Sequence, residues 1–237
     1  ASKWTKNMGG HAGKCPPPSR SMGLVFRELK KQARESGISE QFQVTFEATH
    51  HGPYLRSPAM FLEIGSTEEN WVRQDAGDCW ARTLQNTILS DNNGGLSEDS
   101  EQQVVVLSLG GGHYVPFIND IVLSSERVTP GHMIPSYLLD DVIVDDQEEK
   151  SEEGEREWEQ AIETAVDASY NAAISSNIID NGEIVWERGR NATSCLKVYI
   201  DKKSFKAPAR QKVIELLQRM GLEYTTKKRD AVFFDHP

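Results

Sequence analysis

Side chains that could carry out chemistry gather in one stretch of the sequence, residues 44–66. Imidazole and carboxylate groups occur there together, at the ends of two short apolar runs: Glu47, His50, His51 and Glu63. Another histidine, His113, directly follows three glycines. In α/β proteins working groups commonly lie in loops at strand ends, because the strands hold those loops in fixed positions. Histidine with glutamate in this pattern is typical of a metal site or of a proton-transfer site.

The two adjacent histidines follow a stretch, residues 43–49, that alternates between apolar and polar side chains and so predicts a strand. If the strand continues to residue 51, His50 falls on the apolar side and His51 on the side of Glu47. Adjacent histidines on an extended strand cannot both bind one metal ion. We therefore expect their side chains to diverge, unless the chain turns at Gly52 and Pro53. A hydrogen-bonded core histidine is the alternative for His50.

The glycine triplet consists of Gly110, Gly111 and Gly112, and it ends an apolar run at 104–109 that reads as a strand buried on both faces. Glycines at such a place let the backbone approach a ligand or offer N–H groups to an anion. The triplet matches neither G-x-G-x-x-G nor a Walker A loop, and a plain tight turn is the alternative. The histidine that follows it favours a site.

Charge and cysteine content limit the setting. Residues 140–163 contain twelve acidic and two basic residues, which accounts for the whole net charge of −10. The rest of the chain is neutral, so its charge does not exclude an anionic partner. Three widely spaced cysteines form no disulfide framework and no zinc-type pair, and no apolar run is long enough to span a membrane. We expect a cytoplasmic protein without a membrane partner, with the nucleus as a further possibility.

Helices and strands are expected to alternate along the chain. Helices are predicted at 21–36, from a capping box at Ser66 and Glu69 to residue 89, at 155–176 and at 208–220. Strands are predicted at 43–49, 61–64, 104–109, 127–134, 184–186, 197–200, 222–225 and 231–234. This order predicts an α/β fold with a mixed, mostly parallel central sheet flanked by helices. Cys79 falls on the apolar face of its helix, which favours a buried residue over a nucleophile.

The domain organisation expected from composition is simple. Residues 1–20 read as a loop or as the remnant of a longer N-terminal segment, and residues 21–237 as one domain with a disordered acidic insert at about 140–157. The helix at 21–36 has a basic face, which indicates either a solvated surface or contacts to a phosphate backbone: Arg20, Arg27, Lys30, Lys31 and Arg34.

Three motifs resemble, in order and spacing, the archaeal and plant type of D-aminoacyl-tRNA deacylase. They are E-A-T-H-H-G-P at 47–53, E-I-G-S at 63–66 with Trp71, and G-G-G-H-Y at 110–114 with Pro116. His132, with Ile134 and Tyr137, matches a downstream histidine segment of that family. The resemblance covers roughly residues 15–237. Family members usually carry a further N-terminal segment, and the acidic insert is longer here than in compact archaeal members, which suggests a eukaryotic member.

The resemblance implies a fold like that of the phosphorylase and peptidyl-tRNA hydrolase group. It also implies dependence on Zn²⁺ and hydrolysis of the ester between a D-amino acid and tRNA, including aldehyde-modified D-aminoacyl-tRNAs. Zinc lowers the pKa of a bound water to about 7. The expected metal ligands or catalytic groups are His50, His51, Glu63 and His113, with Glu47 and His132 as further candidates. The expected substrate contacts are Thr49, Gly110, Gly111, Gly112 and Tyr114. We expect D-aminoacyl-tRNA as the partner and a monomer.

Two other functions remain open from the sequence. One is a non-catalytic tRNA- or nucleotide-binding module of the same fold. The other is a peptidyl-tRNA hydrolase or phosphorylase-like enzyme, which rests on fold analogy alone. A phosphorylase needs arginines near the glycine turn, and none lies within ten residues of 110–113.

Overall fold

The computed structural model describes residues 9–89, 103–139, 152–174, 178–180, 183–185, 196–230 and 234. The strands of its main sheet are β1 (Val104–Leu109), β2 (Val128–Ile134), β5 (Leu196–Ile200) and β6 (Tyr224–Thr225). They pair in parallel in the order β2-β1-β5-β6. Two further strands, β3 (Ile178–Asp180) and β4 (Glu183–Val185), pair antiparallel with each other. This arrangement confirms the predicted α/β class with a parallel central sheet.

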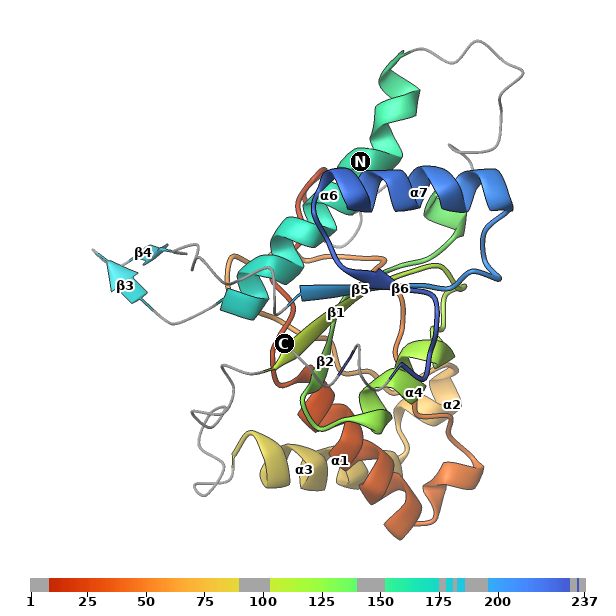
Figure 1. Ribbon diagram of the computed structural model, residues 1–237. Helices are drawn as coiled ribbons and strands as arrows, with labels where there is room; N and C mark the ends of the chain where they lie inside the picture. Colours follow the sequence, from red (N-terminus) through yellow and green to blue (C-terminus); the bar gives the residue numbers. More distant parts are fainter. Residues whose placement is uncertain are drawn as a thin grey trace.

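Helices cover both faces of the sheet (Figure 1). They are α1 (Met22–Glu35), η2 (Ile38–Glu40), α2 (Glu68–Trp71), α3 (Gln74–Thr87), α4 (Pro116–Ser124), α6 (Glu152–Ile174) and α7 (Ala207–Arg219). Helix α1 ends as the sequence predicts, because Gly37 follows it with a φ of 75°, a left-handed conformation that suits glycine.

Strand β1 builds both hydrophobic cores, because successive side chains of a strand point to opposite faces. All six of its residues are buried, as its uninterrupted apolar run predicts. Val105, Leu107 and Leu109 pack in the core that α6 and α7 cover. Val104 and Val106 pack in the other core, with α1 and α4. The carboxyl end of β1 is therefore held rigidly from both sides.

The predicted strands at 43–49 and 61–64 are wrong, since neither stretch joins a sheet. Residues 43–49 are extended, but they form only one isolated bridge, between Glu47 and Tyr114. The alternation still gives the buried side correctly, because Phe46 and Ala48 are buried. This stretch lies across the carboxyl end of the sheet instead of lengthening it.

The helix predicted from residue 66 to 89 is two helices. Its first turn has Thr67 as N-cap, whose hydroxyl accepts from the Asn70 side chain and from no backbone N–H, so the predicted capping box of Ser66 and Glu69 is wrong. The helix is interrupted before α3 because Arg73 has an extended backbone. The guanidinium of Arg73 binds both Asp75 and Gln41, which fixes the interruption against residues 41–42. Cys79 is buried, as predicted.

Residues 15–19 form neither helix nor strand, yet they are packed into the fold. The Ala59 N–H donates to the Pro17 carbonyl, and the Ser19 N–H donates to the Ala59 carbonyl. Of the predicted acidic insert, residues 140–151 lie outside the described residues, and α6 begins at Glu152. The strand predicted at 231–234 also lies outside them, except for Phe234, which is buried. None of the helices described is both long and apolar enough to cross a membrane.

Candidate functional site

Residues 46–49 are fixed against two neighbouring segments by backbone hydrogen bonds. The Ala48 N–H donates to the His113 carbonyl at 2.8 Å, and the Val115 N–H donates to the Phe46 carbonyl at 3.2 Å. The Thr49 N–H donates to the Met133 carbonyl at the end of β2, at 2.8 Å. These bonds place the side chains of Glu47 and His50 beside the turn that follows β1.

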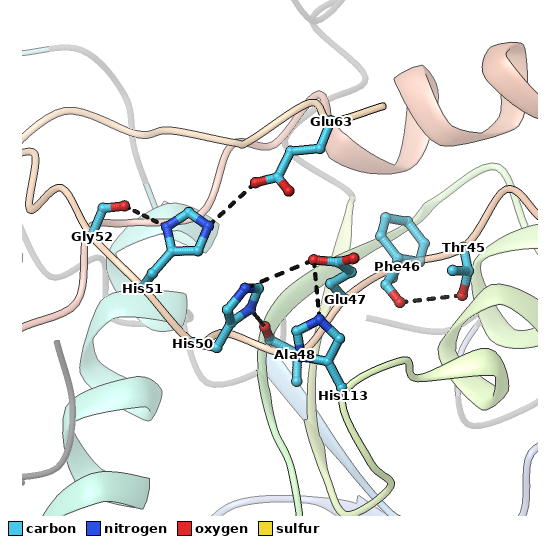
Figure 2. Close-up of polar contacts among 9 residues, drawn as sticks. All are labelled: Thr45, Phe46, Glu47, Ala48, His50, His51, Gly52, Glu63 and His113. Carbon is cyan, nitrogen blue, oxygen red and sulfur yellow. Dashed lines mark hydrogen bonds and ion pairs between the residues drawn. The ribbon is translucent and has the colours of Figure 1, made fainter. Parts of the chain in front are cut away.

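Glu47, His50 and His113 form one cluster at this point (Figure 2). A single oxygen, Oε2 of Glu47, lies 3.8 Å from Nε2 of His50 and 3.6 Å from Nε2 of His113. The two imidazole rings lie with their centroids 4.5 Å apart. All three side chains are partly accessible, with exposed fractions between 29% and 46%. The cluster therefore opens to solvent and to a ligand.

The donor atoms of this cluster fit a zinc ion. Zinc binds imidazole nitrogen and carboxylate oxygen at about 2.0–2.2 Å, so tetrahedral ligand atoms lie about 3.3 Å apart. The three donor atoms here lie within 4.8 Å of one another, so binding would draw them slightly together. Nδ1 of His50 donates to the Ala48 carbonyl at 2.6 Å, since a carbonyl can only accept. This bond leaves the lone pair of Nε2 available to a metal. Metal-binding histidines usually donate their other ring N–H to a carbonyl or carboxylate in this way.

His51 and Glu63 form a second pair beside the first cluster. Nε2 of His51 lies 3.2 Å from Oε1 of Glu63, and Nδ1 donates to the Gly52 carbonyl at 2.5 Å. The rings of His50 and His51 are nearly perpendicular, at 87°. The two histidines thus face different carboxylates, although their rings touch edge-on with centroids 4.5 Å apart. The strand alternation predicts His51 on the side of Glu47, but His50 faces Glu47 instead, because the chain leaves the regular strand after residue 49.

His132 serves the fold and has no nitrogen left for a metal. Its Nε2 donates to the Pro16 carbonyl at 2.9 Å, and its Nδ1 accepts from the Thr49 hydroxyl at 3.0 Å. The Thr49 hydroxyl also accepts from the Met133 N–H. Burial lowers the pKa of His132 from 6.5 to about 4, so this ring is neutral. Thr49, which was predicted to contact substrate, thus joins the His50 segment to β2.

The glycine turn after β1 uses two of its three amides within the fold. The Gly110 N–H donates to the Ile134 carbonyl at 2.8 Å, and the Gly111 N–H donates to the hydroxyl oxygen of Ser204 at 2.7 Å. Ser204 in turn donates to a carboxylate oxygen of Asp201 at 2.6 Å. The expected anion cradle therefore cannot be built from Gly110 and Gly111. Within the part of the chain that the structure describes, the Gly112 N–H has no acceptor.

Ser204 and Asp201 are positioning residues that sequence reasoning missed. They lie in the turn after β5, which is the sheet neighbour of β1. Their only signal in the sequence is a pair of hydrogen-bonding side chains three residues apart just after a strand. Tyr114, the predicted stacking residue, is half-exposed, and its ring contacts that of His113 edge-on at 5.0 Å.

A largely apolar cavity of about 490 Å³ adjoins both histidine groups. It lies between residues 41–49 and the helices α1 and α3, with Phe26, Leu29, Phe46 and Trp80 among its lining residues. Glu47, His50, His51 and Glu63 lie at its border. Cys79 also lines it, and burial raises the pKa of this thiol, which confirms that it is no ready nucleophile. The site can therefore hold an apolar group beside its reactive side chains.

Comparisons with known proteins agree with these motifs. The family model described as D-aminoacyl-tRNA deacylase matches residues 2–225. A D-aminoacyl-tRNA deacylase of Arabidopsis thaliana is 35% identical over 212 residues, which are 88% of this chain and 62% of that protein. A D-aminoacyl-tRNA deacylase of Methanosarcina mazei is 29% identical over 220 residues, 91% of this chain and 55% of that protein.

A solved structure shares the fold. The crystal structure of the conserved protein of unknown function AF0625 matches with a TM-score of 0.62 at 24% identity, over 93% of this chain and 61% of that one. The chain thus spans less than two thirds of the length of these relatives. Because the family model covers nearly the whole sequence, this chain belongs to the D-aminoacyl-tRNA deacylase family.

Proposed function

We propose that this chain hydrolyses the ester bond between a D-amino acid and the 3′ end of tRNA. Family membership supports the reaction, because relatives bear the name D-aminoacyl-tRNA deacylase. The observation that carries the proposal at the level of chemistry is the Glu47 oxygen that faces Nε2 of both His50 and His113. Such a group of imidazoles and a carboxylate, open to solvent beside a cavity, suits hydrolysis of an activated ester.

Glu47, His50 and His113 are the residues that would hold a zinc ion, in place of the set predicted from the sequence. When bound, zinc supplies polarisation of the ester carbonyl and acidifies water. The protein supplies the geometry: the Ala48 carbonyl fixes the tautomer of His50, and the glycine turn holds His113 on the end of β1. The oxygen of Glu47 lies between the two rings and keeps them facing the same point.

His51 and Glu63 suit proton transfer in this reaction. Water adds its oxygen to the carbonyl carbon, and its proton passes to the Glu63 carboxylate, whose Oε1 lies 3.2 Å from Nε2 of His51. The bond between the carbonyl carbon and the ribose oxygen then breaks, and the ribose oxygen takes up the proton. The Gly52 carbonyl orients the ring through Nδ1. The Gly112 N–H is the amide of the turn that can reach the developing oxyanion.

The apolar cavity suits the side chain of the amino acid, because Glu47, His50, His51 and Glu63 line it. A half-exposed aromatic ring, that of Tyr114, lies beside His113 and suits stacking on the terminal base of the RNA. The amino-acid side chain and the terminal base would then be held on either side of the ester. This positioning raises the effective concentration of the reacting atoms.

The test is hydrolysis of D-Tyr-tRNA against L-Tyr-tRNA by the purified chain, with zinc content measured on the same sample. We expect hydrolysis of the D form and a fall of at least about 100-fold in the rate for His113→Ala, because one of the three proposed metal ligands is lost. Circular dichroism checks that the variant is folded. Wild-type turnover in a folded His113→Ala protein would reject the assignment, and no hydrolysis by the wild type would reject the function for this chain.

A further inference from the structure

Lysine and arginine side chains gather in two turns at the carboxyl end of the sheet. We call these six residues the basic edge: Lys202, Lys203 and Lys206 after β5, and Lys227, Lys228 and Arg229 after β6. All six are exposed. Because β1, β5 and β6 are adjacent and parallel, both turns leave the sheet on the side where the glycine turn leaves it (Figure 1). The basic edge therefore lies on the same side of the sheet as the candidate site.

Hydrogen bonds connect the first of these turns directly to the turn that carries His113. Asp201 and Ser204 flank the two adjacent lysines, and the Ser204 hydroxyl accepts from the Gly111 N–H at 2.7 Å. The second turn lies against α4, since Nζ of Lys228 is 3.9 Å from Asp120. Helix α4 begins three residues after His113, at Pro116. Both turns thus border the segment 110–120 that presents the histidine.

The positive charge of the basic edge is only partly neutralised. The carboxylates of Asp201 and Asp230 lie in the same two turns and reduce its charge from six to four, and each accepts a hydrogen bond from a hydroxyl of its own turn, Ser204 at 2.6 Å and Thr225 at 3.3 Å. Of the six basic residues, Lys228 alone has an acidic partner among the described residues. A cluster of exposed like charges gives this edge a positive potential that attracts an anionic partner.

The basic face of α1 is the alternative surface for a phosphate backbone, and much of it serves the fold. Arg27 donates to the carbonyl oxygens at four positions: Val122, Ser125, Glu126 and Val128. Lys31 pairs with Glu28 at 3.6 Å. Lys30 lies over the ring of Phe26. These contacts leave the basic edge as the better surface.

We propose that the basic edge binds the phosphate backbone of the RNA whose 3′ end reaches the site of Glu47, His50 and His113. The proposal rests on the proposed function and adds the surface that holds the partner. Lysine and arginine that neutralise phosphates release bound counterions, so the binding depends strongly on salt and weakly on sequence. The acid-rich stretch at 140–163, which makes the whole chain acidic, does not include this edge.

The experiment compares two charge-matched double variants of the full chain, K202E/K203E on the basic edge and K31E/R34E on α1. The probe is a deacylated tRNA transcript, titrated by fluorescence anisotropy at several KCl concentrations. We expect K202E/K203E to raise the Kd about tenfold or more at low salt. The slope of log K against log salt should become shallower by about 1 for each lost phosphate contact. K31E/R34E should stay within about twofold of the wild type. Equal losses in both variants, or no loss in K202E/K203E, would overturn the proposal.

Two further arms keep the result interpretable. The neutral variant K202Q/K203Q replaces K202E/K203E if thermal denaturation shows that the reversal perturbs folding, and it should lower affinity in the same direction. The ratio of kcat/KM for D-Tyr-tRNA to that for D-tyrosyl-adenosine, which lacks the backbone, should fall about tenfold in K202E/K203E. If the wild type hydrolyses neither ester, the proposed function fails, and the tRNA titration still decides the binding surface. Stronger binding to vesicles of anionic lipid than to tRNA would also overturn the proposal.

Discussion

At the scale of single residues, the two glutamates of the site lie in different surroundings. Glu47 faces two imidazoles with one oxygen and is about one third exposed, whereas Glu63 faces His51 alone and is 53% exposed. A less exposed carboxylate that faces two imidazoles suits a metal ligand, and a more solvated one suits proton transfer. The two roles can be separated by experiment.

Glu47→Gln and Glu63→Gln should have different effects. Glu47→Gln removes the anionic donor between two rings, so we expect loss of zinc together with a fall of at least about 100-fold in the deacylation rate. Glu63→Gln should keep zinc and lose about 100-fold or more in rate, because the carboxylate that takes the water proton is removed while the three metal ligands remain. Zinc content by mass spectrometry and single-turnover rates measure both. Loss of zinc in Glu63→Gln but not in Glu47→Gln would show that Glu63 is the metal ligand and Glu47 the proton-transfer group.

His132 predicts a stability that falls in acid. Its pKa is about 4 in the folded protein and near 6.5 in the unfolded chain, so the unfolded state binds more protons between these values. Stability is complete above about pH 6.5 and decreases as the pH falls to about 4, by about 3 kcal/mol in total. His132→Gln should remove this dependence, at the cost of lower stability at neutral pH. Urea unfolding at several pH values measures the slope, and an unchanged slope in the variant contradicts the assignment.

At the scale of elements, the glycine turn determines where His113 lies. Gly110 and Gly111 have φ angles of 111° and 80°, which residues other than glycine rarely adopt. Ser204 then fixes the turn through the Gly111 N–H. The turn is thus held both by its own backbone conformation and by the neighbouring strand.

Gly111→Ala should destabilise the protein by about 2–4 kcal/mol, because of the positive φ and because its Cβ overlaps a ring. The added Cβ would lie 2.6 Å from Cε1 of Phe117. Gly112→Ala is the matched control, since no atom lies within 4 Å of its added Cβ and its φ is not in the left-handed range. Urea unfolding of both variants measures the difference. Equal stability of the two would show that the turn is not under this constraint.

The sequence predicts the buried elements better than the extended ones at the site. The apolar run at 104–109 and the periodic pattern of α1 are dictated by burial, and both elements are found. Residues 43–49 show the right alternation, but their backbone bonds go to residues 113–115, to Met133 and to the Asn119 side chain. Alternation reports which side is buried and does not report which segment the backbone pairs with.

At the scale of the whole molecule, the site joins segments that are distant in the sequence. Glu47 and His113 are 66 positions apart, and the Ser204 that fixes the turn is a further 91 positions along the chain. Motifs at 47–53, 63–66 and 110–114 therefore contain the residues of the candidate site. The pairing of Glu47 with His113 and the support from Ser204 depend on tertiary contacts, which no local pattern encodes.

If zinc binds at this site as proposed, it should stabilise the folded chain. A ligand that binds only the folded state adds about 2.7 kcal/mol at 100 times its Kd, which raises the Tm by about 5–10 °C for a chain of this length. We expect zinc to raise the Tm and a chelator to reverse the change. Calorimetry on the wild type and on Glu47→Gln measures the effect. The variant should show no shift, and a shift equal to that of the wild type would place the zinc elsewhere.

The two ends of the parallel sheet should tolerate insertions and deletions to different degrees. Strands β1 and β5 begin at Val104 and Leu196, at the end of the sheet opposite the one that bears His113 and Ser204. The ladder between Val105–Leu109 and Leu196–Ile200 fixes the register of both strands independently of the segments that precede them in the sequence. Insertions and deletions there can accumulate without moving a reactive atom. The first change in function should therefore come from the opposite end, where one inserted residue shifts a histidine.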